Sequence, residues 1–213
     1  MAKIIAILNS KGGAGKSTIS SNLARCLQIM GNSVLIADSD PQGTLRDWRQ
    51  ADHKDIQPSV VGVDRPTLHK DLPKVASSFD FVIIDGAAKL QEMVASSVKA
   101  AHTILIPVQP SAADIWGCRD LVSLIKARQE VTEGHPKASF LINRQIKNTN
   151  LARDITVLLD EFELPIFNSR TSQLVVYAEA LSTGTTVLDA DPNGAAATEI
   201  KNISKELLEF IHG

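Results

Sequence analysis

The stretch Ile4–Thr18, IIAILNSKGGAGKST, decides the fold of this chain. Its first five residues are apolar and have the length of a buried strand, and a helical pattern runs from Lys16 to Met30. Gly31 follows that pattern, and glycine commonly ends a helix. The stretch therefore predicts a strand, a glycine-rich loop and a helix in direct succession.

The loop between this strand and helix has the composition of a phosphate-binding turn. The backbone N–H groups of a glycine-rich turn at a helix N-terminus point towards one anion, and the helix dipole adds a favourable potential. We expect Lys16 to reach the β- and γ-phosphates of a nucleotide and the Ser17 hydroxyl to bind Mg²⁺. The usual motif has a glycine where this chain has Ser10, and a second lysine, Lys11, stands near the start of the loop.

The rest of the chain alternates short apolar runs with longer helical patterns. This alternation predicts an α/β fold, a single doubly wound domain over residues 1–213, with a mostly parallel sheet and helices on both faces. The stretch from Ala51 to Leu72 has a weaker pattern and predicts a short strand and loops before a helix near 68–78. The other expected helices lie near 89–99, 111–131, 149–160, 172–182 and 193–211, and the expected strands are Ile4–Leu8, Val34–Ala37, Phe81–Ile84, Thr103–Ile106, Ala138–Ile142 and Leu164–Phe167.

Composition excludes several classes of protein. Hydrophobic residues make up 44% of the 213 residues, which excludes a disordered chain and a protein with many membrane spans. Two cysteines, Cys26 and Cys118, are too few for a disulfide framework or a four-thiolate zinc site, and we expect both to be buried. The formal net charge of −2 predicts that any nucleic-acid binding depends on a local patch. Without a secretory pattern or an apolar run of about 18 residues, the sequence predicts a cytoplasmic protein that does not bind membrane.

Carboxylates follow two of the expected strands, at the sheet edge where ligands bind. Asp38 and Asp40 follow Val34–Ala37, and Asp85 follows Phe81–Ile84. Asp85 is expected to hold Mg²⁺ through water, whereas Asp38 is expected to have a structural role. Each aspartate has a plainer interpretation as well, because aspartate also ends strands and caps helices.

The arrangement Lys11-Gly12-Gly13-Ala14-Gly15-Lys16-Ser17 resembles the deviant Walker A motif of the ParA/MinD family of ATPases. In that family the additional lysine contacts the nucleotide of the partner subunit in an ATP-sandwiched dimer, which implies this role for Lys11. Asp38-Ser39-Asp40-Pro41-Gln42 resembles the switch I segment of the family, in which the residue at Asp40 helps to place the attacking water. The segment from Pro107 to Gly117 resembles one near the nucleotide and the dimer interface, although Trp116 is equally consistent with ordinary core.

The resemblance implies a set of site residues and covers nearly the whole chain. Catalytic roles fall to Lys11, Lys16 and Asp40, and Mg²⁺ would be held by Ser17, Asp40 and Asp85. Asn143 follows a strand where the family often contacts adenine, but asparagine also simply ends strands. The nucleotide-binding residues implied for ATP are Lys11, Gly12, Gly13, Ala14, Gly15, Lys16, Ser17, Thr18 and Asn143.

Within the family, the short chain looks most like the small ParA proteins of plasmid partition. That likeness implies an ATPase with weak activity alone, a homodimer with ATP, a centromere-binding adaptor protein, and non-specific DNA binding that places the ATP-bound form on the nucleoid. Basic residues for DNA are Arg144, Lys147, Arg153 and Arg170, although such residues usually mark a solvated face.

Three other interpretations remain to be weighed. MinD-like proteins end in a basic amphipathic helix for membranes, but the last helix here is amphipathic with more Glu than Lys, so we expect Ile200, Ile203, Leu207 and Ile211 to pack in the core. A MinD-like or other ATPase that positions a protein complex stays open as an alternative. So does an ATP-dependent small-molecule synthetase on the same fold.

Overall fold

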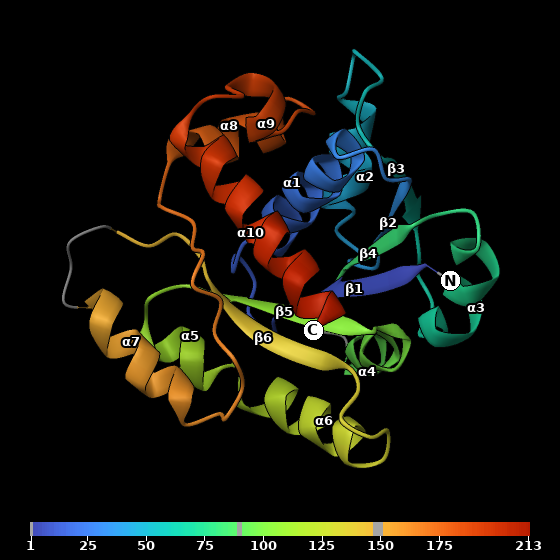
Figure 1. Cartoon of the computed structure of the whole chain (residues 1–213). Coiled ribbons are helices and arrows are strands. Elements are labelled where there is room, and N and C mark those ends of the chain that lie inside the picture. Colours follow the sequence, from blue (N-terminus) through green and yellow to red (C-terminus); the bar gives the residue numbers. More distant parts are fainter. Residues whose placement is uncertain (1, 89–90, 147–150) are drawn as a thin grey trace.

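The computed structural model describes residues 2–88, 91–146 and 151–213, and within them a single parallel sheet forms the centre of the molecule (Figure 1). Its strand order is β3-β2-β4-β1-β5-β6, and every neighbouring pair is parallel. The strands are β1 (Lys3–Ile7), β2 (Val34–Asp38), β3 (Ser59–Gly62), β4 (Phe81–Asp85), β5 (Thr103–Val108) and β6 (Lys137–Ile142). The α/β fold class expected from the sequence is confirmed.

Alternate residues of β1 point to opposite faces of the sheet and enter two separate hydrophobic clusters. Ile5 and Ile7 pack with α1, α2, α8, α9 and α10, whereas Ile4, Ala6 and Leu8 belong to the cluster on the other face. Because both faces are covered, the strands consist of nearly unbroken apolar runs. The helices on the first face are α1 (Lys16–Ile29), α2 (Thr44–Gln50), α8 (Val175–Ser182), α9 (Val187–Ala190) and α10 (Ala195–His212).

The second face carries α3, α4, α5, α6 and α7. Their bounds are α3 (Leu68–Ala76), α4 (Gln91–Ala100), α5 (Ala112–Trp116), α6 (Arg119–Glu130) and α7 (Leu151–Asp160). Both cysteines are buried, as expected. Ile200, Ile203, Leu207 and Ile211 of α10 are buried too, which confirms that its apolar side packs in the core. Among the described residues, none of the helices combines the length and the apolar character that crossing a membrane requires.

Two expected elements differ from the structure. Leu164–Phe167 does not form a strand; Ile166 makes an isolated bridge to Phe140 beside β6. Pro165 has no backbone N–H to donate, so the segment cannot extend a full ladder. The helix expected over 111–131 is two helices, α5 and α6, which Gly117 and Cys118 separate.

Candidate functional site

Side chains from the ends of β1, β5 and β6 hold the loop between β1 and α1 in shape. Asn9 is buried; its Nδ2 donates to the Pro107 carbonyl (2.7 Å), and its Oδ1 accepts from the Lys11 N–H (2.8 Å). Gln109 Nε2 donates to the Gly13 carbonyl at 2.8 Å. These hydrogen bonds connect the loop to the ends of the strands. They therefore fix the direction of the loop's backbone N–H groups.

Asn143, at the end of β6, lies directly against the loop. Its Nδ2 donates to the Ala14 carbonyl at 2.7 Å, and its Oδ1 accepts from the Thr171 hydroxyl. The buried amide therefore connects the loop to the segment after β6. That is a role the sequence did not indicate, and contact between Asn143 and a base stays a prediction.

Lys16, the first residue of α1, is buried, with its ammonium aimed along the loop. Its Nζ donates to the Lys11 carbonyl at 3.3 Å. Burial lowers the pKa of this ammonium, and the charges of Asp85 and Asp40 act in the opposite direction without reversing the shift. A buried ammonium with one long hydrogen bond inside a loop of N–H donors is a strong site for a polyphosphate.

Asp85 is the last residue of β4, lies against the first turn of α1, and is fully buried. Its two oxygens accept from the hydroxyls of Ser17 (2.7 Å) and Ser20 (2.9 Å). Burial raises the pKa of this carboxyl to about 7, against the lowering effect of the Ser17 hydrogen bond. A hydroxyl and a carboxylate at this spacing are oxygen ligands that Mg²⁺ accepts directly or through water, so the residues fit the ion.

The two aspartates after β2 have different surroundings. Asp38 is buried and accepts from the backbone N–H groups of Asp40 and Arg46, both at 3.1 Å. Burial raises the pKa of Asp38, and the hydrogen bonds from Arg46 and Asp40 offset the shift only in part. Asp40 is partly exposed and accepts from the Gln42 N–H at 3.0 Å. The structural role expected for Asp38 is confirmed, because it shapes the turn that presents Asp40.

A cavity of about 610 Å³ brings many of the expected site residues together, but Lys11, Ala14 and Asp85 do not line it. Gly12, Gly13, Gly15, Lys16, Ser17, Thr18 and Asp40 all line it. A second cavity of about 740 Å³ shares Thr18 and Arg144 with the first and extends past Asn143 to Tyr177. Both volumes lie in the range of small-molecule sites, and together they suit a ligand with a charged end and a flatter, less polar end.

Lys11 leaves this cavity and turns towards α5. Its Nζ lies 2.6 Å from a carboxylate oxygen of Asp114, whose side chain is 7% exposed. Trp116, two residues further along, is 56% exposed. The interpretation of Trp116 as a core residue is therefore wrong.

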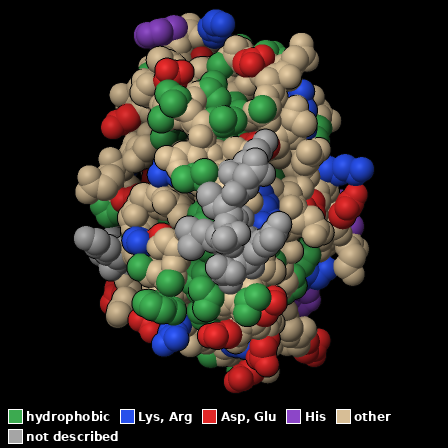
Figure 2. Space-filling model, turned by 90° about the vertical axis from the view of Figure 1, so that its left-hand side faces the viewer, with side chains coloured by type: hydrophobic (Ala, Val, Ile, Leu, Met, Phe, Trp, Pro, Cys, Tyr) green, Lys and Arg blue, Asp and Glu red, His purple; other side chains and the backbone are tan. Residues whose placement is uncertain are grey.

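The residues proposed for DNA lie partly around the second cavity. Arg144 is exposed and lines both cavities, and Arg170 donates to the Gln145 amide oxygen at 3.3 Å. Lys147 and the side chain of Arg153 lie outside the described residues. On the face shown in Figure 2, the described Lys and Arg side chains are dispersed singly among hydrophobic and polar ones.

Four contributors to the site were missed by the sequence analysis: Asn9, Ser20, Gln109 and Asp114. Ser20 lies one turn after Ser17, so helical spacing could have indicated that both meet the same carboxylate. The other three act through the packing of the loop against β5 and α5. Gln109 and Asp114 lie in the Pro107–Gly117 segment whose resemblance already indicated the neighbourhood of the nucleotide, whereas no local pattern marks Asn9.

Comparison with known proteins agrees with this geometry. Residues 5–208 match the model of the CobQ/CobB/MinD/ParA nucleotide binding domain. The chain belongs to this family. The family is named for nucleotide binding, and the phosphate-loop geometry described above is the candidate site for that nucleotide.

Individual relatives agree with the family. The chain is 29% identical over 208 residues to the maintenance of carboxysome distribution protein A of Halothiobacillus neapolitanus, covering 96% of this chain and 95% of that protein. It is 25% identical over 253 residues to the sporulation initiation inhibitor protein Soj of Bacillus subtilis, covering 97% and 98%. The septum site-determining protein MinD of Pyrococcus horikoshii, solved with Mg-ADP, has the same fold, with a TM-score of 0.76, 19% identity and coverage of 97% and 96%. The expected cofactors, ATP and Mg²⁺, are consistent with that bound nucleotide.

Proposed function

We propose that this protein is an Mg²⁺-dependent ATPase that dimerises with ATP and drives the partition of plasmid or chromosomal DNA together with an adaptor protein. The observation that carries the catalytic part is the meeting of Lys16, the Ser17–Asp85 pair and Asp40 around one cavity. Bound Mg²⁺ would supply positive charge beside the phosphates. Lys16 would bind the β- and γ-phosphates, while Ser17 and Asp85 would hold the ion.

Asp40 is the residue that we expect to act on water. Asp40 lines the cavity, and its backbone N–H donates a hydrogen bond to the Asp38 carboxylate. Phosphoryl transfer depends mostly on positioning and electrostatics, so the carboxylate needs only to orient the attacking water. Among the described residues of one chain, Lys16 and Arg144 are the only Lys or Arg residues that line this cavity. We expect slow turnover until a second chain contributes Lys11.

Mutation of the two central residues tests the enzymatic proposal. Lys16→Ala is expected to abolish nucleotide binding, because it removes the buried ammonium. Asp40→Ala is expected to keep binding and to stop turnover, as measured by phosphate release and by titration of a fluorescent ATP analogue. Asp47→Ala, an exposed aspartate of α2, is the matched control and should behave as wild type. Hydrolysis by Asp40→Ala at the wild-type rate would show that our assignment of Asp40 is wrong.

DNA binding is proposed on the basis of Arg144 and Arg170, because Arg170 donates to Gln145, the residue that follows Arg144. Contacts of these cations with phosphates need no base recognition, and affinity should fall steeply with salt because counterions are released. Anisotropy titrations with a non-hydrolysable ATP analogue should show binding to any duplex, weakened by Arg170→Ala. Arg119→Ala, an exposed arginine of α6, is the control that should leave affinity unchanged.

A second candidate is the positioning of a protein assembly. It is favoured by the relative of Halothiobacillus neapolitanus, which is named for carboxysome distribution and matches over nearly its whole length. Deletion of the gene separates the candidates. Partition predicts loss of the DNA cargo from daughter cells, whereas the second candidate predicts normal DNA inheritance with a misplaced protein assembly.

A further inference from the structure

Glu199 of α10 holds the segment that follows β6 through its carboxylate. One oxygen accepts from the Ser172 N–H at 3.0 Å and lies 2.9 Å from the Tyr177 hydroxyl, and the other oxygen accepts from the Ser172 hydroxyl at 2.6 Å. The Ala196 carbonyl, at 3.3 Å, is a more distant acceptor for the same tyrosine. Burial raises the pKa of the Tyr177 phenol, and the charge of Glu199 raises it further, so the phenol stays protonated and donates.

Ser172 and Tyr177 form part of the wall of the second cavity, the one of about 740 Å³. Thr18 and Arg144 line both this cavity and the phosphate cavity, so the two spaces meet there. A nucleotide with its phosphates in the loop would continue past Thr18, and its base and sugar would lie against the wall. Glu199 does not line the cavity, and it contacts the wall from behind.

The backbone holds only one side of this wall. The Gln145 N–H donates to the Thr171 carbonyl at 2.7 Å, and the Gln173 N–H donates to the Gln145 carbonyl at 3.1 Å. In this parallel bridge the Ser172 N–H is turned away from Gln145, and Glu199 is the acceptor that it meets. Hydrogen bonds to an ionised acceptor are about twice as strong as those between neutral groups, so the carboxylate orders the other side of the wall.

We propose that Glu199 is a positioning residue for the nucleoside part of the ligand, because it keeps Ser172 and Tyr177 in the arrangement that receives the base and sugar without touching either. The inference rests on the proposed function, since it takes one nucleotide to occupy both cavities. A wall that is already ordered loses little conformational freedom when the ligand binds, and affinity rises accordingly. The phosphates bind at the other end and gain nothing from Glu199.

Glu206 provides a matched control on the same helix. It lies about two turns beyond Glu199 and accepts from the N–H groups of Asn168 and Ser169 at 2.7 Å and 2.8 Å. Neither of these donors lines either cavity. Glu206→Ala therefore removes the same charge and the same kind of contact from α10 while leaving the cavity wall in place.

Calorimetric titration with Mg²⁺ and a non-hydrolysable ATP analogue is the test. Glu199→Ala should bind the analogue about tenfold more weakly than wild type, because two freed side chains must be ordered on binding. Glu206→Ala should bind it as wild type does. Inorganic tripolyphosphate, which fills only the phosphate end, should bind Glu199→Ala and wild type equally. Loss of a negative charge near a polyphosphate would by itself strengthen binding, so the expected weakening has the opposite sign to a purely Coulombic effect.

Two conservative variants separate the position of the carboxylate from its charge. Glu199→Gln keeps the length of the side chain and an acceptor oxygen, and it should retain most of the affinity for the analogue. Glu199→Asp keeps the charge but is one methylene shorter, so it cannot reach both Ser172 and Tyr177 and should bind the analogue several-fold more weakly. Glu199→Asp also decides the question if Glu199→Ala does not fold.

Three results would overturn this inference alone: wild-type affinity of Glu199→Ala or Glu199→Asp for the analogue, an equal loss in Glu206→Ala, or an equal loss of tripolyphosphate binding in Glu199→Ala. Failure of the wild-type chain to bind the analogue would overturn the proposed function and this inference together.

Discussion

Replacement of Gly15 by alanine tests how the loop is held against the end of β6. Gly15 has φ 92° and ψ 18°, a left-handed backbone that alanine adopts with strain. A Cβ built there would lie 2.1 Å from Asn143 Nδ2 and 3.3 Å from its Cγ. Asn143 would have to move, and it would leave its bonds to the Ala14 carbonyl and the Thr171 hydroxyl.

The magnitude follows from these two effects. Left-handed backbone costs alanine about 1–2 kcal/mol. Two displaced hydrogen bonds add about 1 kcal/mol each. We therefore expect the free energy of unfolding to fall by about 3–4 kcal/mol, which for a chain of this size corresponds to a decrease in Tm of about 6–16 °C.

Thermal and urea unfolding without nucleotide are the assays. Gly12→Ala is the control, because no described atom outside Gly12 and its two chain neighbours lies within 4 Å of its Cβ position, and it should change stability by less than about 1 kcal/mol. In the background of Asn143→Ala, Gly15→Ala should cost only the backbone strain, about 1–2 kcal/mol. Equal costs of Gly15→Ala in the two backgrounds would refute the role of Asn143, and a Gly15→Ala protein as stable as wild type would refute both effects.

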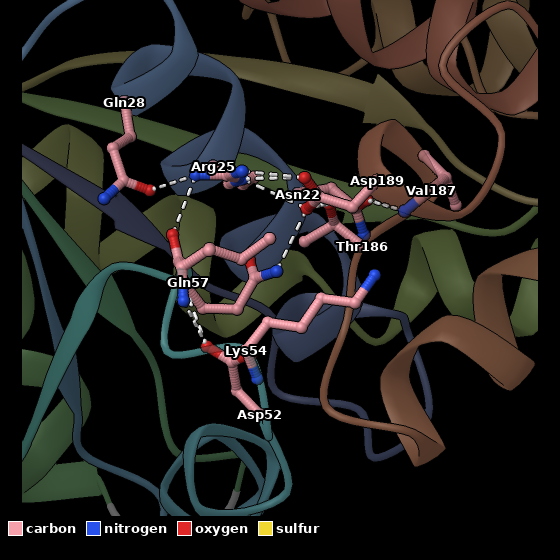
Figure 3. A network of polar contacts seen from close by, with 10 residues as sticks. Asn22, Arg25, Gln28, Asp52, Lys54, Gln57, Thr186, Val187 and Asp189 are labelled. Carbon is pink, nitrogen blue, oxygen red and sulfur yellow. Dashed lines mark hydrogen bonds and ion pairs between the residues drawn. The ribbon is translucent and has the colours of Figure 1, made fainter.

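Two further predictions concern the attachment of α9 and α8 to the rest of the molecule. In the network of Figure 3, Asp189 accepts from Arg25, Gln57 and Thr186; burial raises its pKa, but these hydrogen bonds more than offset this, so its pKa lies below the ordinary 3.8. Asp189→Asn should lower the free energy of unfolding by about 2–3 kcal/mol at neutral pH. Because a lowered pKa stabilises the folded state only while the carboxylate is ionised, the difference from wild type in urea unfolding should shrink as pH falls through about 3.8 and below. A difference independent of pH would contradict the assignment. Gly184→Ala should lower the free energy of unfolding by about 2–4 kcal/mol in the same assay. Gly184 has φ 69°, and a Cβ there would lie 2.3 Å from the Ala51 carbonyl carbon. An unchanged stability would show that this contact is not close.

The sequence alone determined the parts of the site that are built locally. The apolar run of β1, the glycine-rich loop and the start of α1 are contiguous, so their spacing is enough to predict a phosphate site at Lys16 and Ser17. Asp85 was placed for a similar reason, because a short apolar strand and the acidic residue at its end are adjacent in the chain. Parallel strands then bring their carboxyl ends to one edge.

Only the tertiary structure decided what each loop side chain faces. Helical periodicity predicted one helix over 111–131, but the loop meets Gly117 through Ser10, and the chain turns there into α5 and α6. Asp114 lies far from Lys11 in sequence, and Asn143, at the end of β6, reaches Ala14 across β5, the strand between β6 and β1. Such partners are determined by the order of the strands in the sheet, because that order decides which strand ends are neighbours. The strand order depends on packing across the whole chain, and no local spacing of residues encodes it.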